Sequence, residues 1–324
     1  MKPMRIYRQL DELPAADGPV VATIGNFDGV HLGHQAVIAE VIARARFLGG
    51  VSLVITFDPH PTRVLRPQQP HPLITPLARK LELLADTGID ATLVLPFTEE
   101  MGRRSAREFA TEVLVRAVHV TEVHEGANFR FGHHAEAGVT GPDGLQSLGK
   151  ELGFSVMVYG PRSLRGAPVS SSRIRSLIAA GDVSHARALV GVPFSVDSTP
   201  ASGRGYGTRY AVPTINLAPY NELLPANGVY ITTLTVGTGS HAETFHAVTN
   251  LGVRPTFGEA SFAVESHLLD FHQIELTEKT PLRLAFLRRL RAEERFASPE
   301  ALREQIARDA ARARRYFELC RALR

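Results

Sequence analysis

The first half of the chain alternates between short apolar runs and longer stretches whose apolar residues recur with helical spacing. The first run, residues 20–24, precedes a stretch in which Val37, Ile38, Val41 and Ile42 fall on one helical face. Short continuous apolar runs are typical of buried parallel strands, and the helical stretches are typical of the crossovers between them. The sequence therefore predicts an α/β domain with a parallel sheet. Further strands are expected at residues 51–57, 91–96 and 154–159, and further helices at 76–87, 105–118 and from 170 onward.

Beyond residue 193 the pattern changes to short apolar runs separated by frequent turns. Such runs favour antiparallel strands, and a small barrel with long loops fits their lengths and spacings. A long amphipathic helix is expected over residues 298–323. We place one domain at residues 1–187 and a second, a small antiparallel β-barrel with a C-terminal helix, at residues 188–324. Its expected strands are 193–197, 228–236, 244–250, 261–270 and 282–291.

Composition narrows the class of protein. The chain has 36 Lys plus Arg against 33 Asp plus Glu, a net charge of +3, which gives little electrostatic support for a nucleic-acid partner. Its single cysteine, Cys320, cannot form an intramolecular disulfide and is expected to be a small buried residue. The N-terminus lacks the apolar core of a signal peptide, and no apolar run approaches the roughly 18 residues of a membrane span. We therefore expect a cytoplasmic protein with neither a nucleic-acid nor a membrane partner; the oligomeric state stays open.

Residues 24–34 read IGNFDGVHLGH and join the first strand to the first helix. The glycines allow a sharp turn close to a ligand, and the free N–H groups of the helix start favour an anion. His31 and His34 are three residues apart, so a helix that begins near His31 places both rings on one face, where they can donate to one phosphate. The alternative is that one histidine caps the helix while the other faces solvent. The length of the whole motif favours the phosphate site.

Three later segments also carry candidate chemistry. Residues 58–61 read DPHP and follow a predicted strand, where ligand sites of open α/β sheets form, although turn chemistry is an alternative for Asp58 and His60. Residues 126–132 read GANFRFG, an aromatic alternation in which Phe129 can equally belong to the core. Residues 169–175 read VSSSRIR, a strong helix start whose arginines oppose the helix dipole, so that an anion is expected beside them.

The second half has its own candidate site. Residues 202–209 read SGRGYGTR, a pattern suited to a loop over phosphates. In an extended segment, Thr214 and Asn216 point the same way and offer two oxygen ligands to one Mg²⁺; a Pro-Thr turn with a capping Asn is the alternative. Glu265 lies in a mostly apolar strand, where it can serve as a general base or face solvent.

These motifs occur in one order that resembles a known family. GNFDGVHLGH is similar to the nucleotidyltransferase superfamily, and the segments LLPANGVY, PTIN, VRPTF and FAVESHLLDF resemble a riboflavin kinase module. Together they resemble the prokaryotic bifunctional riboflavin kinase/FAD synthetases over most of the chain. The resemblance implies a Rossmann-like nucleotidyltransferase domain followed by the barrel. It also implies that riboflavin, FMN and ATP are the small-molecule substrates, with Mg²⁺ at each of two ATP sites.

The resemblance also implies roles for individual residues. In adenylyl transfer His31 and His34 stabilise the transition state, and in the kinase Glu265 takes the proton of the ribityl 5′-hydroxyl. The implied ATP contacts of the adenylyltransferase are Gly25, Asn26, Phe27, Asp28, Gly29, His31, His34, Asn128, Ser171, Ser172 and Arg175, and its implied flavin contacts are Asp58, Pro59, His60 and Pro61. The implied kinase contacts are Gly203, Gly205, Gly207, Thr214 and Asn216 for ATP, Thr214 and Asn216 for the metal, and Arg291 for the flavin.

Two departures from the family pattern keep an alternative open. The chain has PTIN where the family usually has PTAN, and Ala211-Val212 where it has a Gly-Phe pair. The alternative is an FAD synthetase only, whose barrel is a non-catalytic flavin-binding or assembly module. A relative of the class I aminoacyl-tRNA synthetases, which share the HxGH motif, is disfavoured because no KMSKS-like loop is present.

Overall fold

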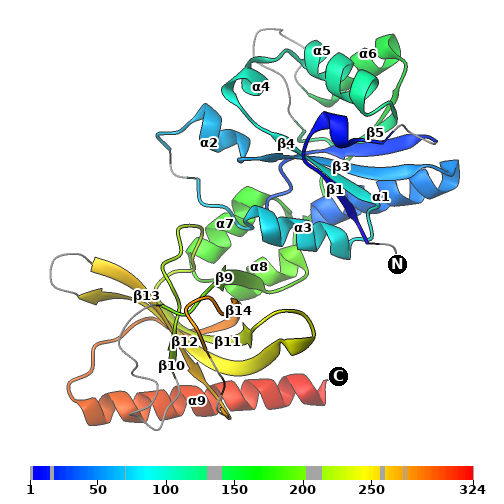
Figure 1. Ribbon diagram of the computed structural model, residues 1–324. Helices are drawn as coiled ribbons and strands as arrows, with labels where there is room; N and C mark the ends of the chain where they lie inside the picture. The colour runs from blue at the N-terminus through cyan, green and yellow to red at the C-terminus, as the bar shows by residue number, and fades with distance from the viewer. Residues whose placement is uncertain are drawn as a thin grey trace. The chain divides into compact units, whose positions relative to one another are not determined.

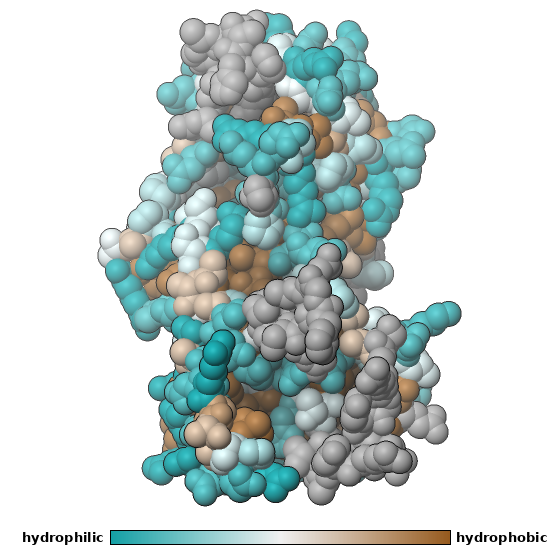
Figure 2. Space-filling model, turned by 90° about the vertical axis from the view of Figure 1, so that its left-hand side faces the viewer, coloured by the Kyte–Doolittle hydropathy of each residue, from teal (hydrophilic) through white to brown (hydrophobic). Residues whose placement is uncertain are grey.

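The computed structural model describes residues 3–14, 18–69, 71–129, 141–201, 214–255, 260–272, 274 and 276–323. The chain divides into two compact units, Met1–Ser171 and Ser172–Arg324. Hydrophilic side chains cover much of the face shown in Figure 2, and the hydrophobic ones there form separate patches. The largest fully buried side chains are apolar or aromatic in both units. Among the described residues, no helix combines the length and the apolar composition that crossing a bilayer requires.

The first unit contains a six-stranded sheet whose neighbouring strands all run parallel. Its order is β1-β4-β3-β2-β5-β6, so the direction of winding reverses between β2 and β5 (Figure 1). Ligands of open α/β sheets bind beyond the carboxyl ends of the strands at such a reversal. The predicted α/β fold is confirmed, although β1 was too short to predict and β5 was not among the predicted strands. The strands are β1 Arg5–Tyr7, β2 Val20–Ile24, β3 Val51–Asp58, β4 Ala91–Pro96, β5 Val120–Gly126 and β6 Ser155–Tyr159.

Helices cover both faces of this sheet (Figure 1). Helices α1 and α3 lie on one face, and α5 and α6 lie on the other. A short hairpin of β7 (Ser163–Leu164) and β8 (Ala167–Pro168) precedes α7 (Ser171–Ala179). The other helical segments are η1 Leu10–Glu12, α1 Leu32–Leu48, α2 Pro61–Leu65, α3 Leu77–Asp86, α4 Glu99–Arg103, α5 Ala106–Phe109, the π-helical η2 Ala110–Ala117 and α6 Pro142–Leu152.

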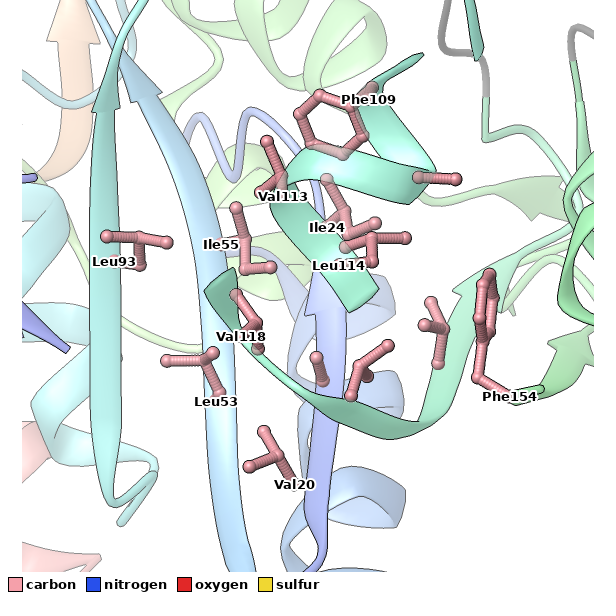
Figure 3. Close-up of a cluster of buried hydrophobic side chains, with 14 of the residues drawn as sticks. Val20, Ile24, Leu53, Ile55, Leu93, Phe109, Val113, Leu114, Val118 and Phe154 are labelled. Carbon is pink, nitrogen blue, oxygen red and sulfur yellow. The ribbon is translucent and has the colours of Figure 1, made fainter. Parts of the chain in front are cut away.

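One core cluster of the first unit joins the three central strands to α5 and η2 (Figure 3). Ile24, Ile55 and Leu93 come from β2, β3 and β4 and contribute to the same cluster as Val113 and Leu114 of η2. A fully buried aliphatic side chain of this kind contributes about 1.5–3 kcal/mol to stability. The cluster fixes the end of β2, from which the loop that begins at Gly25 departs.

The second unit contains a six-stranded antiparallel sheet, ordered β10-β13-β12-β11-β14-β9. Its outer strands meet through a bridge between Pro200 and Leu217, and the Ala201 N–H donates to the Asn216 carbonyl at 2.8 Å. The sheet therefore curves into the expected small barrel. Its strands are β9 Phe194–Ser198, β10 Thr214–Asn216, β11 Gly228–Val236, β12 Glu243–Pro255, β13 Ala260–Leu268 and β14 Leu282–Arg291.

The described part of this unit also contains α8 (Val183–Val190), the short η4 (Gly239–His241) and α9 (Pro299–Ala322), which follow α7 along the chain. The C-terminal helix α9 packs Ala310, Ala313 and Phe317 against the outer face of the barrel in one cluster with Val229 and Val248. Ser298 caps this helix by accepting the Ala301 N–H at 3.3 Å. Cys320, expected to be buried, is exposed because it lies beyond Phe317, the last buried residue of α9.

Candidate active sites

The two histidines of the first unit lie face to face at the start of α1. His31 is the N-cap residue of this helix, and its Nδ1 accepts the backbone N–H of His34 at 3.2 Å. The two imidazole rings stack with their centroids 3.6 Å apart and their planes 13° apart. Gly33 makes this possible, because a Cβ there would lie 3.2 Å from the His31 ring. The predicted pairing is present, and the capping role, weighed as its alternative, is present in the same residue.

Burial keeps both imidazoles neutral at pH 7. It lowers the pKa of His31 to about 4. Burial first, then the neighbouring His31 and the charge of Lys80, hold the pKa of His34 well below 6.5. Because Nδ1 of His31 accepts a hydrogen bond, the proton of its neutral ring is on Nε2, which can then donate to a ligand. Nδ1 of His34 is buried and has no hydrogen-bond partner among the described residues. Such an orphan in a native site calls for an explanation, and a bound ligand supplies one.

Contacts inside the first unit hold the loop between β2 and α1. The Asp28 carboxylate accepts the Thr75 N–H at 2.9 Å and the Ile74 N–H at 3.2 Å. The Gly29 N–H donates to the Thr75 hydroxyl at 2.9 Å, and Gly29 adopts the left-handed φ of +85° that favours glycine. Asp28 was predicted as an ATP contact, but its buried carboxylate is engaged with backbone N–H groups of the protein. Its side chain therefore positions the loop.

Other predicted residues of this loop also have structural surroundings. Phe27 is buried and meets the His34 ring edge-on at 5.0 Å, so it supports the histidine pair. Asn26 is exposed, and its carbonyl accepts from neighbouring side chains. The Ser171 hydroxyl donates to the Asp28 carbonyl at 2.8 Å, which places Ser171 beside the loop, and its contact with ATP stays a prediction. Ser172 and Arg175 follow on α7 in the second compact unit, and their contact with ATP stays a prediction.

The two remaining predicted segments follow strands that flank β2 in the sheet. Asp58 is the last residue of β3, and His60 caps α2 by accepting the Thr62 N–H at 3.2 Å. The turn chemistry considered for His60 is therefore present, and a flavin contact stays a prediction. On the other side of β2, Asn128 is exposed in the turn that follows β5, where the Phe129 N–H donates to the Gly126 carbonyl. Because carboxyl ends of parallel strands meet at one edge of the sheet, both segments border the same edge as the histidines.

Sequence reasoning missed two buried ionisable residues at this edge. Lys80 of α3 reaches the Asn26 carbonyl with its Nζ at 3.1 Å, and the Glu125 carboxylate accepts the Ile24 N–H at 2.6 Å. Lys80 had a signal, because it falls at the apolar spacing of Leu77, Leu81 and Leu84 on an amphipathic helix. Glu125 had no such signal. Its carboxylate reaches the Ile24 N–H because β2 and β5 stop pairing beyond Ala22 and Val123.

In the second unit, the register of the sheet aligns the candidate residues in one row. Glu265 on β13 lies opposite Asn216 on β10 on one side and opposite Asn250 on β12 on the other. Asn250 in turn lies opposite Val229 on β11. Directly opposed residues of antiparallel strands share a face. Val229 packs in the cluster with α9, so the row lies on the outer face of the barrel that this helix partly covers.

The surroundings of these residues fit an oxygen-lined site. Thr214 and Asn216 alternate with the buried Ile215, so they point the same way as predicted. Glu265 is half-buried, and a fully solvent-facing position, its alternative, is not what the structure shows. Hydroxyl, amide and carboxylate oxygens are the donors that Mg²⁺ prefers. Gly203, Gly205 and Gly207 lie outside the described residues.

Arg291 ends the same row, since it lies opposite Val229 on β14. Its Nε donates to the Asp309 carboxylate of α9 at 2.9 Å, and its guanidinium lies 5.6 Å from the centre of the Phe296 ring. Asp309 is almost fully buried. The structure therefore gives Arg291 a role in fastening α9 to the barrel, and a flavin contact stays a prediction.

Comparison with known proteins decides the family. The family model for FAD synthetase matches residues 13–173, and the model for riboflavin kinase matches residues 190–317. The bifunctional riboflavin kinase/FMN adenylyltransferase of Pseudomonas fluorescens is 36% identical over 312 residues, 96% of this chain and 97% of that protein. The chain belongs to the bifunctional riboflavin kinase/FMN adenylyltransferase family. The protein of that name from Escherichia coli K12 is 31% identical over 98% of this chain and 99% of its own length. The one from Bacillus subtilis is 32% identical over 92% of each.

A solved structure shows the same fold over nearly the whole chain. This crystal structure of a macrolide-efflux protein from Streptococcus pneumoniae is 23% identical and superposes with a TM-score of 0.82 over 96% of this chain and 98% of that one. At this identity the likeness concerns the fold alone. The adenylyltransferase/kinase family assignment therefore rests on the family models and the sequence relatives, which match both halves of the chain.

Proposed function

We propose that this protein makes FMN from riboflavin and ATP in its second domain and converts FMN and ATP into FAD and pyrophosphate in its first. The stacked His31–His34 pair at the N-terminus of α1 is the observation that carries the proposal. We place the domains at residues 1–187 and 188–324, consistent with family models that end at 173 and begin at 190. The proposal includes a cytoplasmic location and small molecules as the substrates.

In adenylyl transfer, a phosphate oxygen of FMN attacks the α-phosphorus of ATP. The new P–O bond forms as the bond from the α-phosphorus to the oxygen bridging toward the β-phosphorus breaks, and pyrophosphate leaves with that oxygen. Such transfers depend on in-line positioning and on compensation of the developing negative charge. Nε2–H of His31, the first N–H groups of α1 and the positive end of its dipole supply that compensation.

In the kinase domain, the ribityl 5′-hydroxyl of riboflavin attacks the γ-phosphorus of ATP and ADP leaves. Glu265 accepts the hydroxyl proton, a task for which a half-buried carboxylate is suited. Asn216, its cross-strand neighbour, and Thr214 would hold Mg²⁺ through their side-chain oxygens. When bound, this ion neutralises phosphate charge. One of the two departures from the family pattern, Ile215, is buried on the other face of β10 and leaves these oxygens in place. The other, Ala211-Val212, lies outside the described residues.

Product analysis tests the proposal. The purified protein is incubated with riboflavin, ATP and Mg²⁺, and the flavins are separated by chromatography. We expect FMN followed by FAD. Formation of FAD only from added FMN, with none from riboflavin, would show instead that the barrel is a non-catalytic flavin-binding or assembly module.

A further inference from the structure

Lys80 is a buried cation beside the loop that carries the histidine pair. Only 5% of the residue is exposed. Its Nζ donates to three oxygens, the Asn26 carbonyl at 3.1 Å, the Thr56 hydroxyl at 3.2 Å and the Phe57 carbonyl at 3.4 Å. These atoms belong to the loop between β2 and α1, residues 25–31 and here called the glycine loop, and to the end of β3. One ammonium group therefore joins two segments at the carboxyl edge of the sheet.

All three of these oxygens are uncharged. Asp28 and Asp58 are close enough to act on the charge of Lys80, but neither forms an ion pair with it in the described part of the chain. Asp28 is itself engaged with the N–H groups of residues 74 and 75. A buried ammonium without a paired carboxylate is costly unless another negative charge compensates it. Burial accordingly lowers the pKa of Lys80.

The positive charge of Lys80 also acts on the histidine pair. Lys80 is one of the groups that hold the pKa of His34 down, after burial and after His31. A triphosphate at the start of α1 would bring several negative charges to this edge of the sheet. It would therefore compensate the buried charge of Lys80 in the bound state only.

We propose that Lys80 is a positioning residue for adenylyl transfer, which holds the Asn26 carbonyl and thus the glycine loop in its ATP-binding form and favours the bound triphosphate through its charge. This inference rests on the proposed adenylyltransferase activity of the first domain. Lys80 acts through the loop and through its field, and it is distinct from the residues that contact the reacting atoms.

Three variants test the proposal in the full-length protein: Lys80→Met removes charge and donors, Lys80→Gln keeps donors without charge, and Lys80→Arg keeps the charge. Lys150→Met, an exposed lysine of the same domain, is the matched control. FAD formation from FMN and ATP gives kcat and the KM for ATP. Cooperative thermal unfolding without ligand reports folding of the first domain, and FMN formation from riboflavin in the same preparation reports folding of the second. The rise in Tm of the first domain on adding ATP with Mg²⁺ reports binding.

We expect Lys80→Met and Lys80→Gln to lower kcat/KM for ATP in FAD formation at least 10-fold and to reduce the ATP-induced rise in Tm. Lys80→Arg should recover most of the loss, and Lys150→Met should behave like the wild type. The acid limb of the pH profile should move to higher pH in Lys80→Met, because His34 loses a positive neighbour. A merely structural lysine would leave this limb in place.

Two results overturn the inference. One is a folded Lys80→Met enzyme that behaves like the wild type: its kcat/KM for ATP stays within about 2-fold, and the midpoint of its acid limb stays within about 0.2 pH units. If Lys80→Met does not fold, Lys80→Gln is judged by the same criterion. The other is a Lys80→Arg variant as impaired as Lys80→Gln. A wild-type protein that makes no FAD would instead contradict the proposed function, whatever the variants do.

Discussion

Asn216 on β10 lies directly opposite Glu265 on β13, although 49 positions, 265 minus 216, separate them in the sequence. Glu265 lies in turn opposite Asn250, so one carboxylate stands between two amides on the face that α9 partly covers. The proposed general base needs a fixed position, and the cross-strand register holds Glu265 in one. The adjacent amide oxygen of Asn216 can hold a metal ion beside the phosphates.

This arrangement predicts the effect of Glu265→Gln. General-base catalysis contributes about 10²- to 10⁴-fold, so FMN formation from riboflavin should fall by about that factor, while FAD formation from supplied FMN should stay unchanged. Asn216→Ala is the companion variant and should raise the Mg²⁺ concentration needed for half-maximal FMN formation. A Glu265→Gln enzyme that phosphorylates riboflavin at the wild-type rate would exclude the carboxylate as the base.

The ion pair between Arg291 and Asp309 predicts a different outcome for Arg291→Met. Removing one partner of a buried pair leaves the other charge uncompensated, at a cost of about 3–5 kcal/mol. Arg291 is partly exposed, so we expect the lower end of that range in denaturant unfolding of the barrel domain. A flavin contact would behave otherwise, raising the KM for riboflavin with no loss of stability. The double variant Arg291→Met/Asp309→Leu should recover stability, because no charge is then left unpaired.

Glu125 predicts a pH-dependent stability. Burial raises the pKa of its carboxyl group well above 4.5, so the native state binds a proton that the unfolded state releases above this pH. Stability is therefore lost as pH rises from about 4.5 through the pKa of the folded state. The total loss is about 1.4 kcal/mol for each unit by which the folded pKa exceeds the unfolded one.

Glu125→Gln keeps an acceptor for the Ile24 N–H and cannot ionise. The variant should match the wild type in free energy of unfolding near pH 4 and exceed it increasingly toward neutral pH. Glu112→Gln, an exposed glutamate of the same domain, is the control. Equal curves for wild type and Glu125→Gln between pH 4 and 8 would show that Glu125 ionises alike in both states.

Local sequence signals predicted much of the fold and part of the site. The buried runs of β2, β3 and β4 and the motif around His31 are local, so periodicity and spacing sufficed to predict them. Antiparallel strands β11 to β14 were also predicted, with ends that differ by a few residues. Strand β1 was missed because three residues carry no usable period.

The missed features depend on contacts between distant segments. Asp28 reads as a ligand in its motif, yet residues 74 and 75 engage its carboxylate. Glu125 fills a gap that exists only because β2 and β5 separate. The guanidinium of Arg291 meets Asp309 because the register of β14 points it at α9. None of these partners lies close in the sequence, so no local pattern could assign them.

His31 is central to the proposed adenylyl transfer, because it both caps α1 and presents Nε2–H to the triphosphate. Initial rates of FAD formation from FMN and ATP in His31→Ser separate these roles, because serine is a good N-cap but lacks the imidazole. We predict a fall of at least 100-fold, about 2.7 kcal/mol in transition-state stabilisation, with FMN formation from riboflavin unchanged in the same sample. FAD formation at the wild-type rate would contradict the proposed mechanism, because His31 would then serve only as the cap of the helix.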